Sequence, residues 1–275
     1  AIRDPYALDE HLAEPALGLD VETEFAAFVE AAHHLGIRVV VEFVFRTAAK
    51  DAAWAKEHPE WFYWIRADVP DRKNGEKSED TYGAPLFTAD ELKNIYDAVG
   101  QGRFHELLPP HRIYRDMFTV PPKPETIRME NGCWRGTAPD PRNGRPVSVR
   151  IPGAFCDWGP DSEQPPWTDV TYLRLYDHPD FNYIGYNTVR MYSAQLARPE
   201  NVVQPLWDKI TEVIPHYQTH YRVDGVMIDM GHALPADLKR GLVARARQID
   251  TDFALWAEEF NLSPAAREEG YNVCV

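Results

Sequence analysis

The sequence has few cysteines and no long hydrophobic run, and both absences narrow the class of protein. Its three cysteines among 275 residues are an odd number, at spacings that fit neither a disulfide framework nor a zinc site. A reducing compartment is therefore expected. No stretch of about 18 apolar residues occurs, so no membrane-spanning helix is expected. The chain opens without a basic-then-apolar leader, which favours a cytoplasmic location.

Positive charge is also scarce. The chain has 29 Lys and Arg against 43 Asp and Glu, a formal net charge of −14. Nucleic acids and anionic membranes attract clustered basic residues, so neither is an expected partner. Aromatic residues, by contrast, reach 12%, including 8 Trp and 13 Tyr. Because aromatic rings can stack on sugar rings, this surplus slightly favours a carbohydrate ligand, although most aromatic residues belong to cores. Nothing indicates an oligomeric state.

Two regions of the chain alternate between helical and strand-like patterns. Apolar residues recur at helical spacing in three segments, and short apolar runs follow them, which predicts an α/β protein with a parallel sheet. The predicted helices span 20–35, 202–217 and 235–248, and the predicted strands span 37–44, 223–229 and 253–257. No terminal element is expected in 270–275. Three strands cannot close an eight-stranded barrel, so we expect a piece of a longer protein.

A different composition separates these two regions. Pro, Gly, Asp, Asn and Arg dominate from 66 to 166, with only short strand-like pieces such as 146–150. A hundred structureless residues would be unusual inside a compact domain. We therefore predict an irregular inserted subdomain or lid over 66–166, flanked by barrel segments over 1–65 and 167–275.

Acidic residues end two of the predicted strands. Asp229 closes the strand 223–229, and Glu258 follows the strand 253–257. The carboxyl ends of parallel barrel strands carry the active site, and neighbouring strands lie about 4.8 Å apart. A retaining glycosidase needs two carboxyl groups about 5–5.5 Å apart, which these two acids can supply. Alternatively, Asp229 caps the following helix and Glu258 belongs to a solvated acidic pair.

The segments around these acids resemble a known family. Val223–His232 is similar to the strand-4 signature of the α-amylase superfamily, glycoside hydrolase family 13, and Ala257–Phe260 resembles its strand-5 signature. The strand 40–47 and the insertion match the family's strand 3 and subdomain B. Further segments are most similar to maltosyltransferase-type members: 46–51, 167–172, 187–190 and 231–235. The resemblance implies a (β/α)₈ TIM barrel of which this chain covers strands 3 to 5.

The resemblance also implies roles for individual residues. Asp229 would be the nucleophile that forms a covalent glycosyl-enzyme intermediate. Glu258 would be the acid/base, with Glu259 in its place if the register shifts by one residue. His232 would bind sugar hydroxyls; otherwise it is an ordinary histidine at a helix start. The family's third carboxylate would lie beyond the last residue.

The opening Asp4-Pro5-Tyr6 resembles a loop whose tyrosine stacks under the reacting sugar. By the resemblance, Tyr6 would bind substrate in this way. A tyrosine that simply belongs to the core fits the sequence as well.

Two positions depart from the family pattern, and both bear on the mechanism. Met227 stands where the family has an arginine that keeps the nucleophile ionised, and Glu42 replaces the usual aspartate of strand 3. A cation 4–6 Å from an acid lowers its pKa by about 1–3 units, and methionine supplies none. Arg46 is our candidate for the missing cation; the alternative is that Arg46 forms a structural salt bridge.

We therefore expect an α-amylase-type glycosidase or maltosyl/glucanotransferase acting on α-1,4-glucans by a retaining mechanism, with an oligosaccharide or glucan as partner. No cofactor is expected, and a structural calcium ion is not predicted. The alternative is a catalytically impaired homologue that binds glucans without efficient turnover, which the methionine at 227 would explain. A metal-dependent lyase barrel is disfavoured because no suitable ligand set is present.

Overall fold

The structure is a computed structural model that describes residues 1–68, 88–106, 116–153, 169–178, 197–231, 234–258 and 264–275. The chain forms two compact units. Unit 1 comprises Ala1–Arg3 and Thr47–Val203, and unit 2 comprises Asp4–Arg46 and Gln204–Val275. Unit 2 contains the acids that the sequence analysis singled out.

The centre of unit 2 is a parallel sheet of strand order β1-β9-β10-β11. The parallel α/β arrangement is thus confirmed, whereas the eight-stranded barrel stays a prediction. The expectation of no terminal element was wrong, because residues at the end of the chain pair with β10 as a short strand. The strands are β1 (Val40–Phe43), β9 (Gly225–Ile228), β10 (Ala254–Ala257) and β11 (Val273–Cys274).

The helices of unit 2 follow the predicted pattern with one interruption. The helix predicted over 202–217 is two helices, which meet at Glu212. Pro215 has no N–H to donate to the carbonyl of Thr211, so the helical ladder cannot run through this point. The helical elements are η1 (Glu10–Leu12), α1 (Val21–His34), α6 (Gln204–Thr211), α7 (Val213–His220), α8 (Ala236–Ile249) and α9 (Pro264–Glu268).

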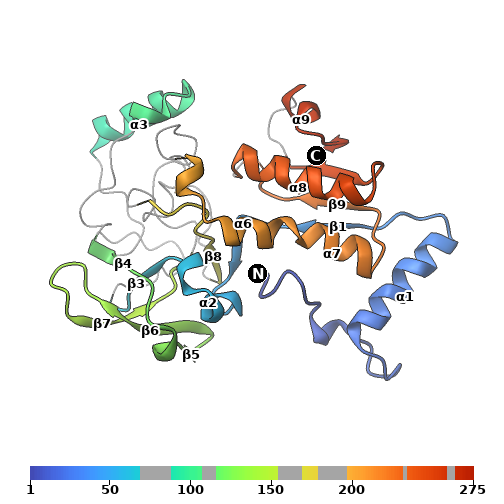
Figure 1. Ribbon diagram of the computed structural model, residues 1–275, viewed down its shortest axis with the longest axis horizontal. Helices are drawn as coiled ribbons and strands as arrows, with labels where there is room; N and C mark the ends of the chain where they lie inside the picture. The colour runs from blue at the N-terminus through green and yellow to red at the C-terminus, as the bar shows by residue number, and fades with distance from the viewer. Residues whose placement is uncertain (69–87, 107–115, 154–168, 179–196, 232–233, 259–263) are drawn as a thin grey trace. The chain divides into compact units, whose positions relative to one another are not determined.

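The two faces of this sheet differ in burial. Side chains alternate between faces along each strand, and Val226, Ile228 and Leu255 on one face are fully buried. Helices α7 and α8 run alongside β1 and β9 (Figure 1). The contact between α7 and β1 includes the rings of Tyr217 and Phe43, which meet edge to face with centroids 4.8 Å apart. The opposite face is more open: Glu42 is exposed. The predicted acids Asp229 and Glu258 follow their strands on this open face.

Asp224 joins α1 to the start of the sheet. Its carboxylate accepts hydrogen bonds from His33 Nε2 at 2.8 Å, Arg38 Nη1 at 2.7 Å and the Val39 N–H at 2.8 Å. Burial alone would raise the pKa of Asp224, but these hydrogen bonds outweigh it and hold the pKa below its ordinary value. The first acid of the strand-4 signature therefore has a structural position, at the end of the sheet away from Asp229.

The Asp224→Asn substitution is expected to destabilise the protein by roughly 1–3 kcal/mol, because it weakens charge-assisted hydrogen bonds and turns an amide N–H₂ toward donors. Since the pKa is lowered on folding, this contribution is present at neutral pH and is lost as the pH falls through the lowered value. Urea unfolding at neutral and acidic pH measures both effects. Asp252→Asn, at an exposed site, is the control; an equal midpoint for the two variants would contradict the prediction.

Unit 1 is more regular than the sequence suggested. Within 66–166, the described residues contain most of a five-stranded antiparallel sheet and a helix, so this part is less irregular than expected. The inserted subdomain itself stays a prediction. The sheet has the order β4-β3-β7-β6-β5, with β3 (Trp64–Arg66), β4 (Phe118–Thr119), β5 (Arg128–Glu130), β6 (Cys133–Pro139) and β7 (Pro146–Arg150). A separate strand pair is β2 (Thr47–Ala49) with β8 (Val170–Tyr172). The helical elements are α2 (Trp54–Glu57), η2 (Pro59–Trp61), α3 (Ala89–Gly100), η3 (Phe104–Glu106), η4 (Pro124–Thr126) and η6 (Pro199–Asn201).

One glycine of this region predicts a loop but lies inside a strand. Gly136 lies inside β6, where a Cβ would come within 2.7 Å of the Pro122 side chain. A close approach of this kind requires glycine inside a strand, although the residue reads as a loop signal. The pairing of β2 with β8 also places 47–65 and 169–178 in unit 1. The segment boundaries 1–65, 66–166 and 167–275 stay a prediction.

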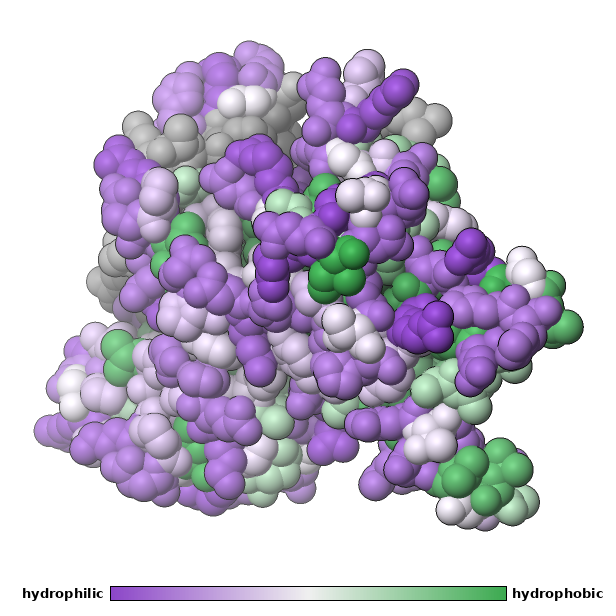
Figure 2. All heavy atoms as spheres, turned by 45° about the vertical axis from the view of Figure 1, so that its right-hand side comes forward, coloured by the Kyte–Doolittle hydropathy of each residue, from purple (hydrophilic) through white to green (hydrophobic). Residues whose placement is uncertain are grey.

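The visible surface of the protein is mainly polar. In Figure 2 most of the visible surface is hydrophilic, and apolar side chains show as separate patches. Within the part of the chain that the structure describes, no helix has the length and apolarity needed to cross a membrane.

Candidate active site

The register of the sheet brings Asp229 and Glu258 together. Ile228 pairs with Phe43 on one side and Ala257 on the other. Hydrogen bonds extend this register by one residue, from the Asp229 N–H to the Phe43 carbonyl at 3.0 Å and from the Glu258 N–H to the Ile228 carbonyl at 3.3 Å. The two acids are therefore side by side at the carboxyl ends of β9 and β10, on the open face of the sheet.

The two carboxyl groups are within hydrogen-bonding reach of each other, and a hydrogen bond between two carboxyl groups requires one shared proton. Burial, the hydrogen bond with Glu258 and the negative charges of Glu258 and Glu42 raise the pKa of Asp229 to about 7. A raised pKa agrees in direction with the loss of the family's arginine at Met227. Like charges in contact cannot both ionise readily, so the pair retains one proton up to near-neutral pH.

Residues 42, 227 and 256 form the layer below the acids. Glu42 pairs with Met227, and Met227 pairs with Trp256, so their side chains share the open face. Met227 and Trp256 are half-buried apolar groups, which disfavour the charged form of a neighbouring carboxyl. The nearest charge in this layer, Glu42, is negative. The departure at Met227 thus favours a proton on the acid pair. The negative charge of Glu42 acts in the same direction, as the charge of an aspartate there would.

The main-chain N–H of the residue after Asp229 opposes the rise in the pKa of Asp229. The Met230 N–H donates to Glu258 Oε2 at 2.8 Å, and its hydrogen bonding lowers the pKa of Asp229. Met230 adopts a left-handed backbone conformation with φ of 51°. This main-chain donor was not predicted from the sequence. The only signal was the glycine that follows at 231, which marks a turn after the strand but not the direction of an N–H.

Arg46 lies three residues after β1 and is almost completely buried, with 1% of its surface exposed. It belongs to the same compact unit as Asp229. Its role as the cation beside the nucleophile stays a prediction.

Tyr6 contacts α6 and α7. Its hydroxyl donates to the Lys209 carbonyl at 2.5 Å, the Lys209 Nζ lies 4.3 Å from the ring centroid, and the ring meets His216 edge-on at 5.2 Å. Burial, together with the negative charges of Glu212 and Asp4, raises the pKa of Tyr6 well above its ordinary value. These contacts attach the N-terminal segment to the helices. Stacking of Tyr6 on a sugar stays a prediction.

Two predicted site residues, His232 and Glu259, lie outside the described residues. Among the residues that are described, no three His, Cys, Asp or Glu side chains come together as a metal site would require. That the chain needs no cofactor stays a prediction.

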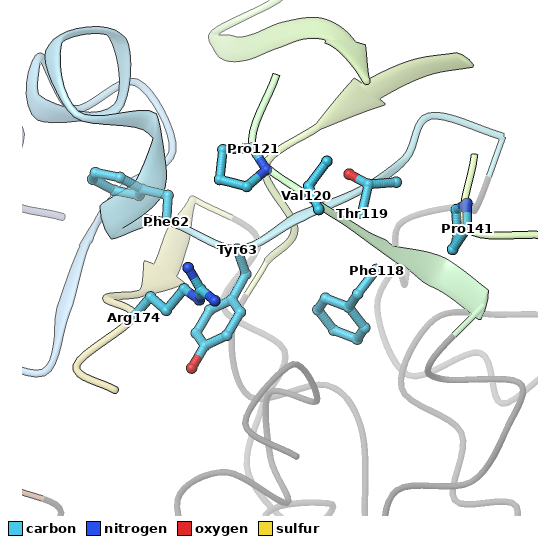
Figure 3. A pocket seen from close by; sticks show the side chains of 8 residues that line it. All are labelled: Phe62, Tyr63, Phe118, Thr119, Val120, Pro121, Pro141 and Arg174. Atoms are coloured by element: carbon cyan, nitrogen blue, oxygen red, sulfur yellow. The ribbon is translucent and has the colours of Figure 1, made fainter. Parts of the chain in front are cut away.

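A separate pocket occurs in unit 1, with a volume of about 240 Å³. Its lining combines aromatic and apolar residues with polar groups, and none of the predicted site residues lines it (Figure 3). Arg174 contributes the charge, but its guanidinium is paired with Asp177 and with the Glu60 carbonyl. The lining residues are Phe62, Tyr63, Phe118, Thr119, Val120, Pro121, Pro141 and Arg174.

No protein-family model matches the chain. Two curated proteins match over 65 residues, or 22% of this chain. Both are alpha-1,4-glucan:maltose-1-phosphate maltosyltransferases of Cereibacter sphaeroides, 42% and 40% identical to this chain in the matched region, which covers 10% and 9% of their lengths.

Solved structures that align with the whole chain include α-amylases of Geobacillus thermoleovorans, in complex with acarbose, and of Anoxybacillus. Each is 12% identical, with TM-scores of 0.44 and 0.45, and the chain covers 36% of each. The similarity to the two curated maltosyltransferases over 65 residues agrees with the resemblance noted in the sequence. The chain spans about a tenth of the curated relatives and about a third of these amylases. The activity of the whole protein is therefore a matter for proposal.

Proposed function

We propose that this chain carries the catalytic acid pair of a retaining α-amylase-type enzyme that cleaves or transfers α-1,4-glucans. The observation that supports the proposal is the hydrogen-bonded pair of Asp229 and Glu258 at the ends of adjacent parallel strands. Two carboxyl groups that share one proton provide one base and one acid, which is the pair of functions that glycosidic bond cleavage needs.

In the first step, Asp229 Oδ attacks the anomeric carbon while the bond from that carbon to the leaving oxygen breaks. The proton held by the pair passes through Glu258 to the leaving oxygen. The carboxyl groups are in contact before substrate binds, so they must separate to about 5–5.5 Å as the glycosidic oxygen enters.

In the second step, an acceptor hydroxyl loses its proton to the Glu258 carboxylate, and its oxygen displaces Asp229 from the anomeric carbon. Water as acceptor gives hydrolysis, and a sugar hydroxyl gives transfer. Both products retain the configuration at the anomeric carbon, because it is inverted twice.

The matched curated relatives favour transfer. They are named as maltosyltransferases that use maltose 1-phosphate and an α-1,4-glucan. For this chain we therefore propose a maltosyl donor and a glucan acceptor as the first pair of substrates to test.

The protein is expected to convert maltooligosaccharides, with and without added maltose 1-phosphate, into products that chromatography resolves by length. Longer oligomers would indicate transfer and shorter ones hydrolysis. Release of phosphate only when donor and acceptor are both present would identify the phosphorylated donor. Proton NMR of the first product gives its anomeric configuration. An inverted product, or no change in any substrate, would contradict the proposal.

A further inference from the structure

Met230 is unusual among the residues that follow the sheet strands. Its left-handed φ of 51° is uncommon for a residue other than glycine, asparagine or aspartate. Conformations of this kind persist where the surrounding structure imposes them, and they cluster at functional sites. Here the residue directly follows the proposed nucleophile.

The unusual conformation determines where the Met230 N–H points. It donates to Glu258 Oε2 at 2.8 Å and also hydrogen-bonds toward Asp229. Main-chain hydrogen bonds fix the backbone on either side of Met230. The Asp229 N–H donates to the Phe43 carbonyl at 3.0 Å, and the Leu234 N–H donates to the Gly231 carbonyl at 3.1 Å. The donor is therefore already oriented between the two carboxyl groups.

No donor comes from the side chain at 227, because methionine has none. We propose that the main-chain amide of Met230, held by its left-handed backbone, is the positioning group that stabilises the ionised form of the acid pair. Met230 is a positioning residue, since it acts through Asp229 and Glu258. This inference rests on the proposed function and deepens it.

Among the described residues, two charged side chains act on Asp229 beside this amide. Glu42 from β1 and Glu258 from β10 both face Asp229, and both raise its pKa, with burial as the largest cause. A donor between carboxyl groups favours their charged form. Removal of the Met230 N–H should therefore make the pair hold its proton to higher pH.

The test replaces the Met230 residue by its α-hydroxy acid, so that a backbone ester removes the N–H and keeps the side chain. Met230→Ile is the genetic counterpart, because a β-branched residue strongly disfavours a positive φ. Met230→Asn is the matched control, since asparagine tolerates the left-handed conformation. Infrared titration of the protonated carboxyl band follows the acid pair without any need for turnover, and the kcat–pH profile follows its effect on the reaction.

The ester and Met230→Ile are expected to raise the titration midpoint by about one pH unit or more, the size expected for a hydrogen bond to a charged group. The acid limb of kcat should move by the same amount, and Met230→Asn should titrate like the wild type. An unchanged midpoint in the ester protein overturns the inference, even if kcat falls at every pH. If the wild type does not turn over glucans, the proposed function fails, while the titration still decides this inference.

Discussion

Asp229→Asn is expected to reduce glucan turnover by about 10⁴-fold or more. Asparagine keeps the shape of the side chain but cannot attack the anomeric carbon as a carboxylate, and loss of a covalent nucleophile typically costs this much or more. Glu258→Gln is expected to cost about 10²–10⁴-fold, the usual contribution of a general acid–base. The loss should be smaller for substrates with good leaving groups, which need less protonation.

Initial rates with maltooligosaccharides and with an aryl glycoside measure both effects. Asp252→Asn is the matched control, because this exposed aspartate precedes β10 at the end of the sheet away from Glu258. Its rate should equal that of the wild type. Substantial turnover by Asp229→Asn would show that another group attacks the sugar, and the proposed pair would have to be abandoned.

Met227→Arg is expected to move the acid limb of the kcat–pH profile to lower pH by about 1–3 units. Residue 227 lies two positions before Asp229 on the same face of β9, so a guanidinium there would favour the ionised carboxylate. The pKa of Asp229 is raised to about 7, so at pH 5 most of the wild-type carboxyl is protonated and cannot attack. The variant should therefore gain roughly 10-fold or more in kcat at pH 5.

The measurement is kcat between pH 4 and pH 9 for the wild type, Met227→Arg and Met227→Gln. Glutamine is similar in size and polar but carries no charge, so its acid limb should stay at the wild-type pH. A Met227→Arg profile that coincides with the wild-type profile would mean that charge at 227 does not control the ionisation of the acid pair.

The sequence predicted the elements that follow simple periodicity. Helix α1 and helix α8 begin and end within one residue of the predicted spans, because each has an apolar stripe. Helix α1 is also followed by Gly36, which favours its end there. The predicted strands were longer than β1, β9 and β10, since apolar residues continue beyond the paired segment. Apart from β7 (Pro146–Arg150), the strands of unit 1 were not recognised, because most are only two or three residues long and too short to show a clear alternation.

The acid pair was predictable because strand ends and parallel pairing are properties of the pattern. Two acids that follow neighbouring parallel strands must meet at one edge of the sheet, and Asp229 and Glu258 do so. Their shared proton and the Met230 N–H were not predictable. Both depend on side-chain distances and on the φ angle of one residue, which no composition or spacing encodes.

The position of β9 in the sheet has a consequence for how the acid pair opens. This strand is bonded to β1 on one side and β10 on the other, so the main chain that carries Asp229 has little freedom to shift. Aspartate also has one side-chain torsion fewer than glutamate, and hence fewer rotamers to choose from. β10 is likewise bonded on both sides, so under the proposed function we expect the longer side chain of Glu258, rather than either main chain, to make most of the adjustment to an incoming sugar.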